Sequence, residues 1–165
     1  MILGMSTAAF TALHVALSLI GIAAGFIVVL GMIWARSLPA WNALFLATTA
    51  LTSLTGFLFP FKGVTPGIVV GILSMAVLIL AIVALYSRRL AGAWRGTYVI
   101  SATLALYFNF FALIAQSFEK IPALNALAPT LSEAPFKIAQ LLALALFATL
   151  AVLAFRRYRL APAIG

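Results

Sequence analysis

The sequence predicts an all-α integral membrane protein, a bundle of five transmembrane helices. Three observations predict it. The chain has 165 residues, 66% of them hydrophobic and only 7% charged, whereas a soluble domain carries roughly 25% charged residues. The apolar residues form long blocks without a polar face, as expected of helices that contact lipid. Little sequence lies outside these blocks, so we expect residues 1–165 to form a single transmembrane domain.

Five blocks approach the length that a membrane span requires, which is about 20 apolar residues. Pro39 opens the second block, Pro60 ends it and Pro66 opens the third. No basic residue precedes the first block, so we expect a retained span and not a cleaved signal. The second block is the shortest, and the alternative topology has four spans with this block re-entrant. The predicted spans are about 7–34, 41–59, 66–87, 95–118 and 135–155, with a long outer loop at 119–134.

The basic residues predict the orientation, because cytoplasmic loops carry an excess of Lys and Arg. One side would carry Arg36, Arg88, Arg89, Arg95, Arg156, Arg157 and Arg159, and the other side Lys62, Lys120 and Lys137. This distribution places the N-terminus outside and the C-terminus in the cytoplasm. An aromatic belt is expected at the arginine side. It would consist of Trp34, Trp41, Tyr86, Trp94, Tyr98 and Tyr158.

The charged and reactive residues exclude several classes of function. The net charge of +8 does not indicate nucleic-acid binding, because the basic residues sit at block ends and not along one face. There is no Cys and no Asp, and Glu119 and Glu133 both fall in the outer loop. One His cannot supply both axial ligands of a haem. We therefore predict no catalytic residue and no metal ligand, the cofactor is unknown, and an enzyme is not favoured.

Polar side chains inside a membrane are costly and are often functional. Five hydroxyls lie close together in the second block, at Thr48, Thr49, Thr52, Ser53 and Thr55. With the predicted orientation, the strongest polar groups of the spans gather in the outer half of the bilayer. The candidate ligand-binding residues are His14, Thr48, Thr52, Thr55, Asn109, Gln116 and Gln140.

These residues allow two interpretations. In the first, the hydroxyls bond to the carbonyl four residues earlier and serve as small groups in helix packing. In the second, Thr48, Thr52 and Thr55 line a cavity open to the outside, with His14 and Asn109 opposite. The outer loop is then either a structured linker or a lid over that cavity. A lid would place Glu119, Asn125, Glu133 and Lys137 at the rim, with a short helix over 122–128.

Two glycine pairs have the GxxxG spacing that lets membrane helices approach closely. Gly21 and Gly25 lie in the first block, on one stripe with Thr11, His14 and Ser18, and Gly67 and Gly71 lie in the third. We expect these four glycines to act in helix packing. They also make other membrane helices plausible partners, in a homo- or hetero-oligomer, besides the lipid bilayer itself.

Three stretches of the chain resemble an uncharacterised group of small multi-span proteins of the bacterial inner membrane. They are TGFLFPF at 55–61, then Thr65 with Pro66, and LNALAPTLSEAPF at 124–136. The resemblance implies a multi-pass protein of the bacterial inner membrane. The group has no assigned activity, so it implies no functional residue.

Three functions follow as candidates. The first is a non-catalytic accessory subunit of a membrane complex, suggested by the small size and the lack of a catalytic set. The second is a membrane protein that handles a small ligand or ion in an outward-facing polar pocket. The third is a membrane enzyme or redox anchor that binds a quinone or lipid substrate, with His14 contributing a hydrogen bond.

Overall fold

The computed structural model describes residues 1–60 and 66–158, and within them every regular element is a helix. Four residues used above, Phe61, Lys62, Thr65 and Arg159, lie outside this described part. The short outer helix was predicted over 122–128, and in the structure it ends at Asn125. The elements are α1 (Thr7–Ile33), α2 (Pro39–Phe57), α3 (Pro66–Ile82) with a π-helical turn η1 (Val83–Ser87), α4 (Trp94–Lys120), α5 (Pro122–Asn125) and α6 (Ala134–Tyr158).

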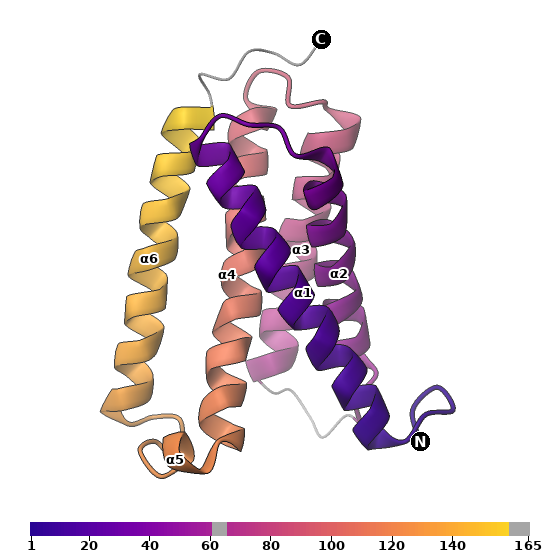
Figure 1. The fold of residues 1–165 in the computed structure, drawn as a ribbon, viewed down its shortest axis with the longest axis vertical. Coiled ribbons are helices and arrows are strands. Elements are labelled where there is room, and N and C mark those ends of the chain that lie inside the picture. Colours follow the sequence, from indigo (N-terminus) through magenta and orange to yellow (C-terminus); the bar gives the residue numbers. More distant parts are fainter. Residues whose placement is uncertain (61–65, 159–165) are drawn as a thin grey trace.

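Four helical segments of the described chain are long and apolar enough to cross a membrane, which indicates a membrane protein. They are Thr7–Ile33, Gly67–Ser87, Trp94–Lys120 and Ala134–Tyr158. The helix α2 is not one of them, because Asn42 and the cluster of hydroxyls lower its hydropathy. It is nevertheless an unbroken helix of 19 residues that packs against α1 and α3 (Figure 1).

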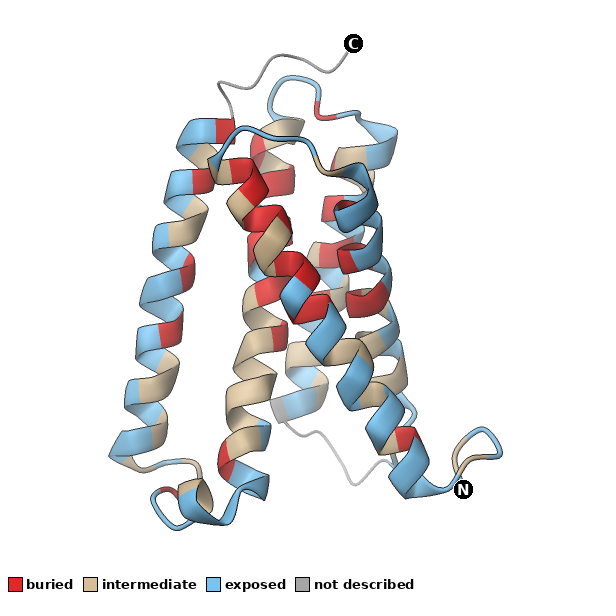
Figure 2. Cartoon of the chain, viewed as in Figure 1, coloured by how far each residue is buried: buried red, intermediate tan, exposed pale blue. Residues whose placement is uncertain are grey.

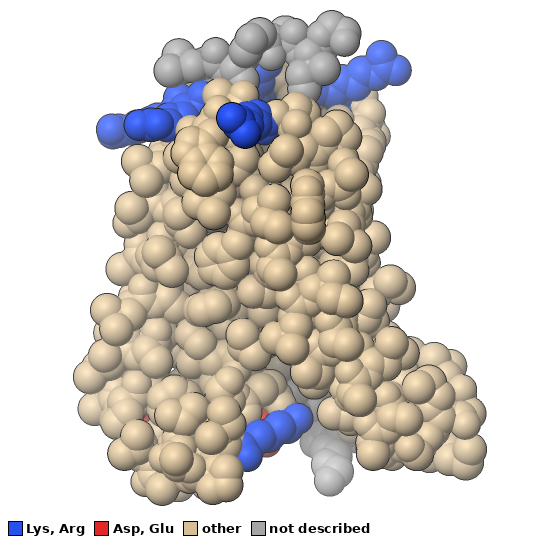
Figure 3. All heavy atoms as spheres, viewed as in Figure 1, with Lys and Arg blue, Asp and Glu red and all other residues tan. Residues whose placement is uncertain are grey.

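The long helices run between two ends of the bundle that differ in charge (Figures 1 and 3). We call one the arginine end, because six arginines lie at or next to the helix termini there. They are Arg36, Arg88, Arg89, Arg95, Arg156 and Arg157. We call the other the lysine end, where α4 finishes at Lys120 and α1 begins. The helix α1 crosses the bundle diagonally and packs against α2, α4 and α6.

The bundle is packed most tightly toward the arginine end. Figure 2 shows the buried residues of α1, α2 and α4 concentrated there, whereas the lysine half is mainly intermediate or exposed. The close approach of α1 depends on Gly25. A Cβ at this position would lie 2.6 Å from Leu106 Cδ1 and 2.8 Å from Phe45 Cε2. Phe26 of the same helix packs on Phe147 of α6, with ring centroids 5.6 Å apart.

The aromatic belt differs from the prediction at two positions. Trp34, Trp41 and Tyr86 are exposed, as a belt residue would be, but Tyr98 and Tyr158 are buried. The Tyr98 hydroxyl donates to Asn42 Oδ1 over 2.8 Å. A buried Asn amide needs a hydrogen-bond partner, and in this fold a tyrosine of α4 provides it. Tyr98 therefore ties α4 to α2 and does not face the membrane surface.

A candidate ligand cavity at the lysine end

A cavity of about 640 Å³ lies between α1, α2, α3 and α4 in the lysine half of the bundle. Figure 3 shows the molecular surface hollowed at this end. Side chains of all four helices line the cavity, whereas α6 contributes none. The walls combine apolar groups such as Leu19, Phe57 and Phe108 with several polar groups. This composition, mostly apolar with a few polar groups, is typical of small-molecule sites.

The deep end of the cavity is closed by a contact between α1 and α4. The Ser18 hydroxyl donates to Asn109 Oδ1 over 2.6 Å, and Asn109 Nδ2 makes a long contact of 3.5 Å with the Ser18 carbonyl. The Ser18 carbonyl can only accept, so the nitrogen of the amide faces it. An Asn amide has two N–H groups, and no partner is found for the second one among the described residues.

Thr49 is the second polar group at the deep end. It is 1% exposed, and its hydroxyl has no hydrogen-bond partner in the described structure. The other hydroxyls of α2 behave differently, since Thr48 and Thr52 each donate to the carbonyl four residues earlier. A Cβ on Gly21 would lie 3.0 Å from Thr49 Oγ1 and 3.3 Å from Asn109 Nδ2. Both polar groups therefore lie close to Gly21, and both residues line the cavity.

His14 lies closer to the mouth and is held by Thr55. Its Nδ1 is 2.8 Å from the Thr55 hydroxyl, and that hydroxyl donates to the carbonyls of Leu51 and Thr52 over 2.7 and 3.1 Å. Thr55 therefore fixes the position of the imidazole, and the direction of the hydrogen bond between them depends on the tautomer of His14. Phe59 packs edge-on against the ring, with centroids 5.4 Å apart.

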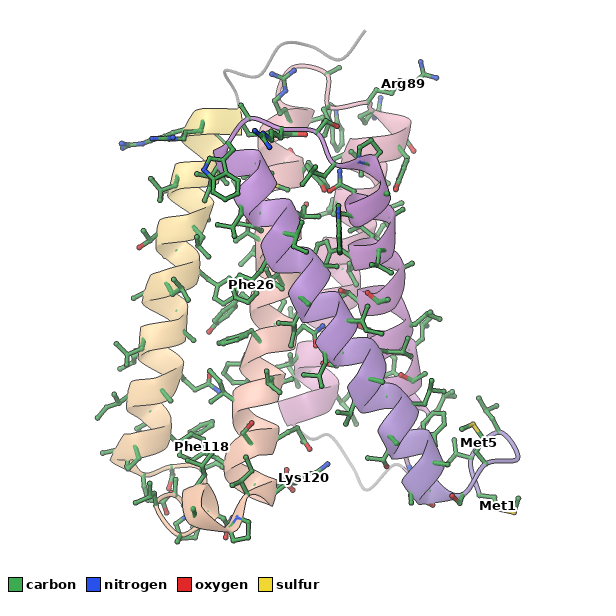
Figure 4. The ribbon with its side chains drawn as sticks, viewed as in Figure 1. Met1, Met5, Phe26, Arg89, Phe118 and Lys120 are labelled. Carbon is green, nitrogen blue, oxygen red and sulfur yellow. The ribbon has the colours of Figure 1, made fainter. Side chains whose placement is uncertain are left out.

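The mouth carries the charge of the site. Lys120 is the one charged residue among the described residues that line the cavity. Figure 4 shows its side chain extending from the end of α4 toward the space between α4 and α1. Gln116, one turn deeper on α4, donates from Nε2 to Glu119 Oε2 over 3.3 Å. A ligand entering from this end would pass a cation before it reaches neutral groups.

The predicted ligand-binding residues separate into three groups. His14, Thr52, Asn109 and Gln116 line the cavity. Thr48 and Thr55 do not line it, although Thr55 holds His14 and Thr48 packs beside Gly21. Gln140 lies elsewhere, between α6 and α4, where its Nε2 donates to the Phe111 carbonyl over 3.2 Å.

The side of α2 that faces the cavity differs from the predicted side. The cavity side consists of Thr49, Thr52, Ser53 and Gly56, so of the predicted residues Thr48, Thr52 and Thr55 only Thr52 lines the cavity. Thr48, Thr52 and Thr55 all bond to the carbonyl four residues earlier, as the packing interpretation expects. Gly56 could have indicated the cavity side of α2 from the sequence. It lies at helical spacing from Thr49, Thr52 and Ser53, and it leaves space beside them.

The glycine pairs have different neighbours. Gly21 and Gly25 lie where α1 meets α2 and α4, the first beside polar groups and the second beside Phe45 and Leu106. A Cβ at Gly71 would lie 3.1 Å from the Phe57 ring. Gly67 lines the cavity.

The predicted outer loop reaches the cavity through Lys120 and Ile121, and not through the four residues predicted for the rim of a lid. Among the described residues that line the cavity, Glu119, Asn125, Glu133 and Lys137 are absent. Glu133 closes its own turn, because its carboxylate accepts from Thr130 Oγ1 at 2.8 Å and from the Ser132 amide at 3.1 Å. The hydrogen bond from Thr130 lowers the pKa of the Glu133 carboxyl below its usual value.

The described residues contain no group of three or more His, Asp or Glu side chains that could hold a metal ion. The side chains that line the cavity offer hydrogen bonding and apolar contact. In comparisons with models of protein families, with curated proteins and with solved structures, nothing matches this chain.

Proposed function

We propose that the protein binds a small lipid-soluble molecule in the cavity between α1, α2, α3 and α4. The observation that carries the proposal is the buried Thr49 hydroxyl, which has no partner among the described residues, beside the Asn109 amide nitrogen at the deep end of a cavity of about 640 Å³. A buried polar group without a partner costs about 1–3 kcal/mol, and a ligand that accepts hydrogen bonds would remove this cost.

The proposal includes a membrane topology. We propose five spans in the bacterial inner membrane, with α2 as the fifth, since its 19 residues reach about 28 Å. The N-terminus and the lysine end would face outward, because the arginine end carries the excess of positive charge. The cavity would then be entered from the outer side of the membrane.

Native mass spectrometry tests the proposal, using the protein extracted gently from its own membrane. We expect a non-covalent small-molecule adduct on the wild-type protein. Ala112 lines the cavity and Ala145 is exposed on α6. The variant Ala112→Phe should lose the adduct because the ring fills the cavity, whereas Ala145→Phe should keep it. An adduct retained by Ala112→Phe, or no adduct on any protein, would contradict the proposal.

The accessory-subunit function stays a prediction, and the same spectrum tests it. A protein partner at fixed stoichiometry would support that function. The two functions are compatible only if the partner and the small molecule occur together. A partner without any small molecule would replace the proposal made here.

A further inference from the structure

We propose that the deep end of the cavity binds the carbonyl group of a neutral, apolar molecule, such as a ketone, quinone or ester, which enters with the carbonyl first. This inference rests on the proposed function and specifies its ligand. It follows from which hydrogen-bonding groups of the cavity are already used and which remain free.

Most polar groups that line the cavity are satisfied within the protein. The hydroxyls of Thr11, Thr52 and Ser117 donate to carbonyls of their own helices over 2.8 Å. Ser53 and Ser74 contact each other at 3.4 Å. These contacts use the hydroxyl protons of Thr11, Thr52, Ser117 and Ser53, and Ser74, which accepts from Ser53, keeps its own proton.

The free groups at the deep end are donors. Asn109 Oδ1 accepts from Ser18, so the amide offers mainly its second N–H. Thr49 offers an O–H that has no acceptor among the described residues. Two donors that lie close together at the deep end match an oxygen with two lone pairs, which a carbonyl group provides. A hydroxyl ligand would fit these two donors less well, because its own O–H would also need an acceptor at the deep end.

The charge of the ligand follows from the position of Lys120. This cation is at the mouth, and neither donor at the deep end is charged. Burying a carboxylate or phosphate there would cost far more than two neutral hydrogen bonds return. Apolar side chains, including Val15, Leu19 and Phe108, surround the rest of the path and suit an alkyl or ring body.

His14 is consistent with this orientation. Its Nδ1 is engaged by the hydrogen bond with Thr55, nearer to the mouth. A carbonyl group at the deep end lies beyond His14 and is within reach of Thr49 and Asn109. The predicted hydrogen bond from His14 to a quinone is replaced by bonds from these two deeper residues.

The test uses 2-decanone with a ¹³C-labelled carbonyl and, as its matched control, decane. Both are added to the full-length protein in lipid nanodiscs, and empty nanodiscs correct for partition into lipid. Infrared difference spectra report the carbonyl stretch, which moves to lower wavenumber when the oxygen accepts hydrogen bonds. We expect a shifted band with the wild-type protein that is absent from empty nanodiscs.

The variants test whether Thr49 donates one of the hydrogen bonds that shift the band. Thr49→Val keeps the side-chain shape and removes the hydroxyl, so it should bind the ketone about tenfold more weakly and reduce the shift. Decane binding should stay the same. Thr49→Ser should restore both the affinity and the shift. Because the removed hydroxyl has no partner, Thr49→Val should fold as well as the wild-type protein.

The outcomes separate this inference from the proposed function. Equal binding of ketone and decane, with no shifted band and no effect of Thr49→Val, would overturn the carbonyl site and leave a ligand cavity. A more than tenfold loss of ketone binding in Lys120→Met would also overturn it, because a neutral ligand placed deep in the cavity does not need the cation. Binding of neither probe, together with no native adduct, would overturn both.

Discussion

The hydrogen bond between Tyr98 and Asn42 shows how a single pair can fix two helices. Both side chains are buried, and the bond is 2.8 Å long. The sequence suggested a belt residue, because Tyr98 is only four residues into α4 and near other aromatic residues. Its burial depends on the rotation of α4 relative to α2, which a single helix sequence does not specify.

Removing the Tyr98 hydroxyl should destabilise the bundle. We expect Tyr98→Phe to lower the free energy of unfolding by about 1–3 kcal/mol, because Asn42 Oδ1 then stays buried without its partner. Equilibrium unfolding in mixed micelles measures the change. Tyr86→Phe is the matched control at an exposed position, and it should stay within about 0.5 kcal/mol of the wild type. Equal effects of the two substitutions would contradict the buried pair.

Two glycines should respond in opposite ways to the same substitution. Gly25→Ala would place a methyl group within 2.9 Å of Phe45 and Leu106, and we expect a loss of about 1–3 kcal/mol of stability. At Gly56 the nearest atom to an added methyl is His14 Cε1 at 3.6 Å. Gly56→Ala should therefore be neutral, or stabilising by about 0.5–1 kcal/mol from helix propensity. Unfolding curves of both variants test this difference, and a destabilised Gly56→Ala with an unaffected Gly25→Ala would refute it.

At the scale of the elements, the sequence predicted helices well and the faces of helices less well. Proline and apolar length mark the helix ends, so α1 begins at Thr7 and α3 at Pro66, where the sequence placed them. The face that α2 turns to the cavity depends on how α1 and α3 pack against it. For that reason Thr49 was not among the predicted ligand-binding residues, although it is the central residue of the candidate site.

The turn before α6 should depend on pH through Glu133. Its pKa is lowered in the folded loop by the hydrogen bond from Thr130. The stabilisation is therefore present above the pKa of the unfolded chain, about 4.3, and is lost as the pH falls through the lower folded value. We expect the amide NMR resonances of Thr130 and Ser132 to be constant at neutral pH and to shift together in acid. Glu133→Gln should remove this titration, and a titration that survives the substitution would contradict the assignment.

At the scale of the whole molecule, the two ends of the bundle have different packing as well as different charge. The arginine end is close-packed around α1, α2 and α4, and the lysine end contains the cavity. The sequence placed the polar residues of the spans toward the lysine end. It could not predict an open space, because volume results from the diagonal course of α1 across the bundle.

The orientation can be tested with single cysteines, because the chain has none. Ala91 lies in the connection between η1 and α4, and Leu127 lies in the loop after α5. A membrane-impermeant maleimide should label Leu127→Cys in intact cells and Ala91→Cys only after the membrane is opened. The reverse pattern would place the cavity mouth on the cytoplasmic side, and labelling of both sites in intact cells would contradict α4 as a membrane span.

The most direct test of the cavity as a binding site is the electron density of the protein crystallised from a lipidic phase, without added ligand. We predict elongated density that is not protein between α1, α2, α3 and α4, with one atom within hydrogen-bond distance of both Thr49 Oγ1 and Asn109 Nδ2. Helices closed onto each other at this end, with Thr49 bonded to a neighbouring carbonyl, would contradict the ligand site and leave the hydroxyls of α2 as packing groups alone.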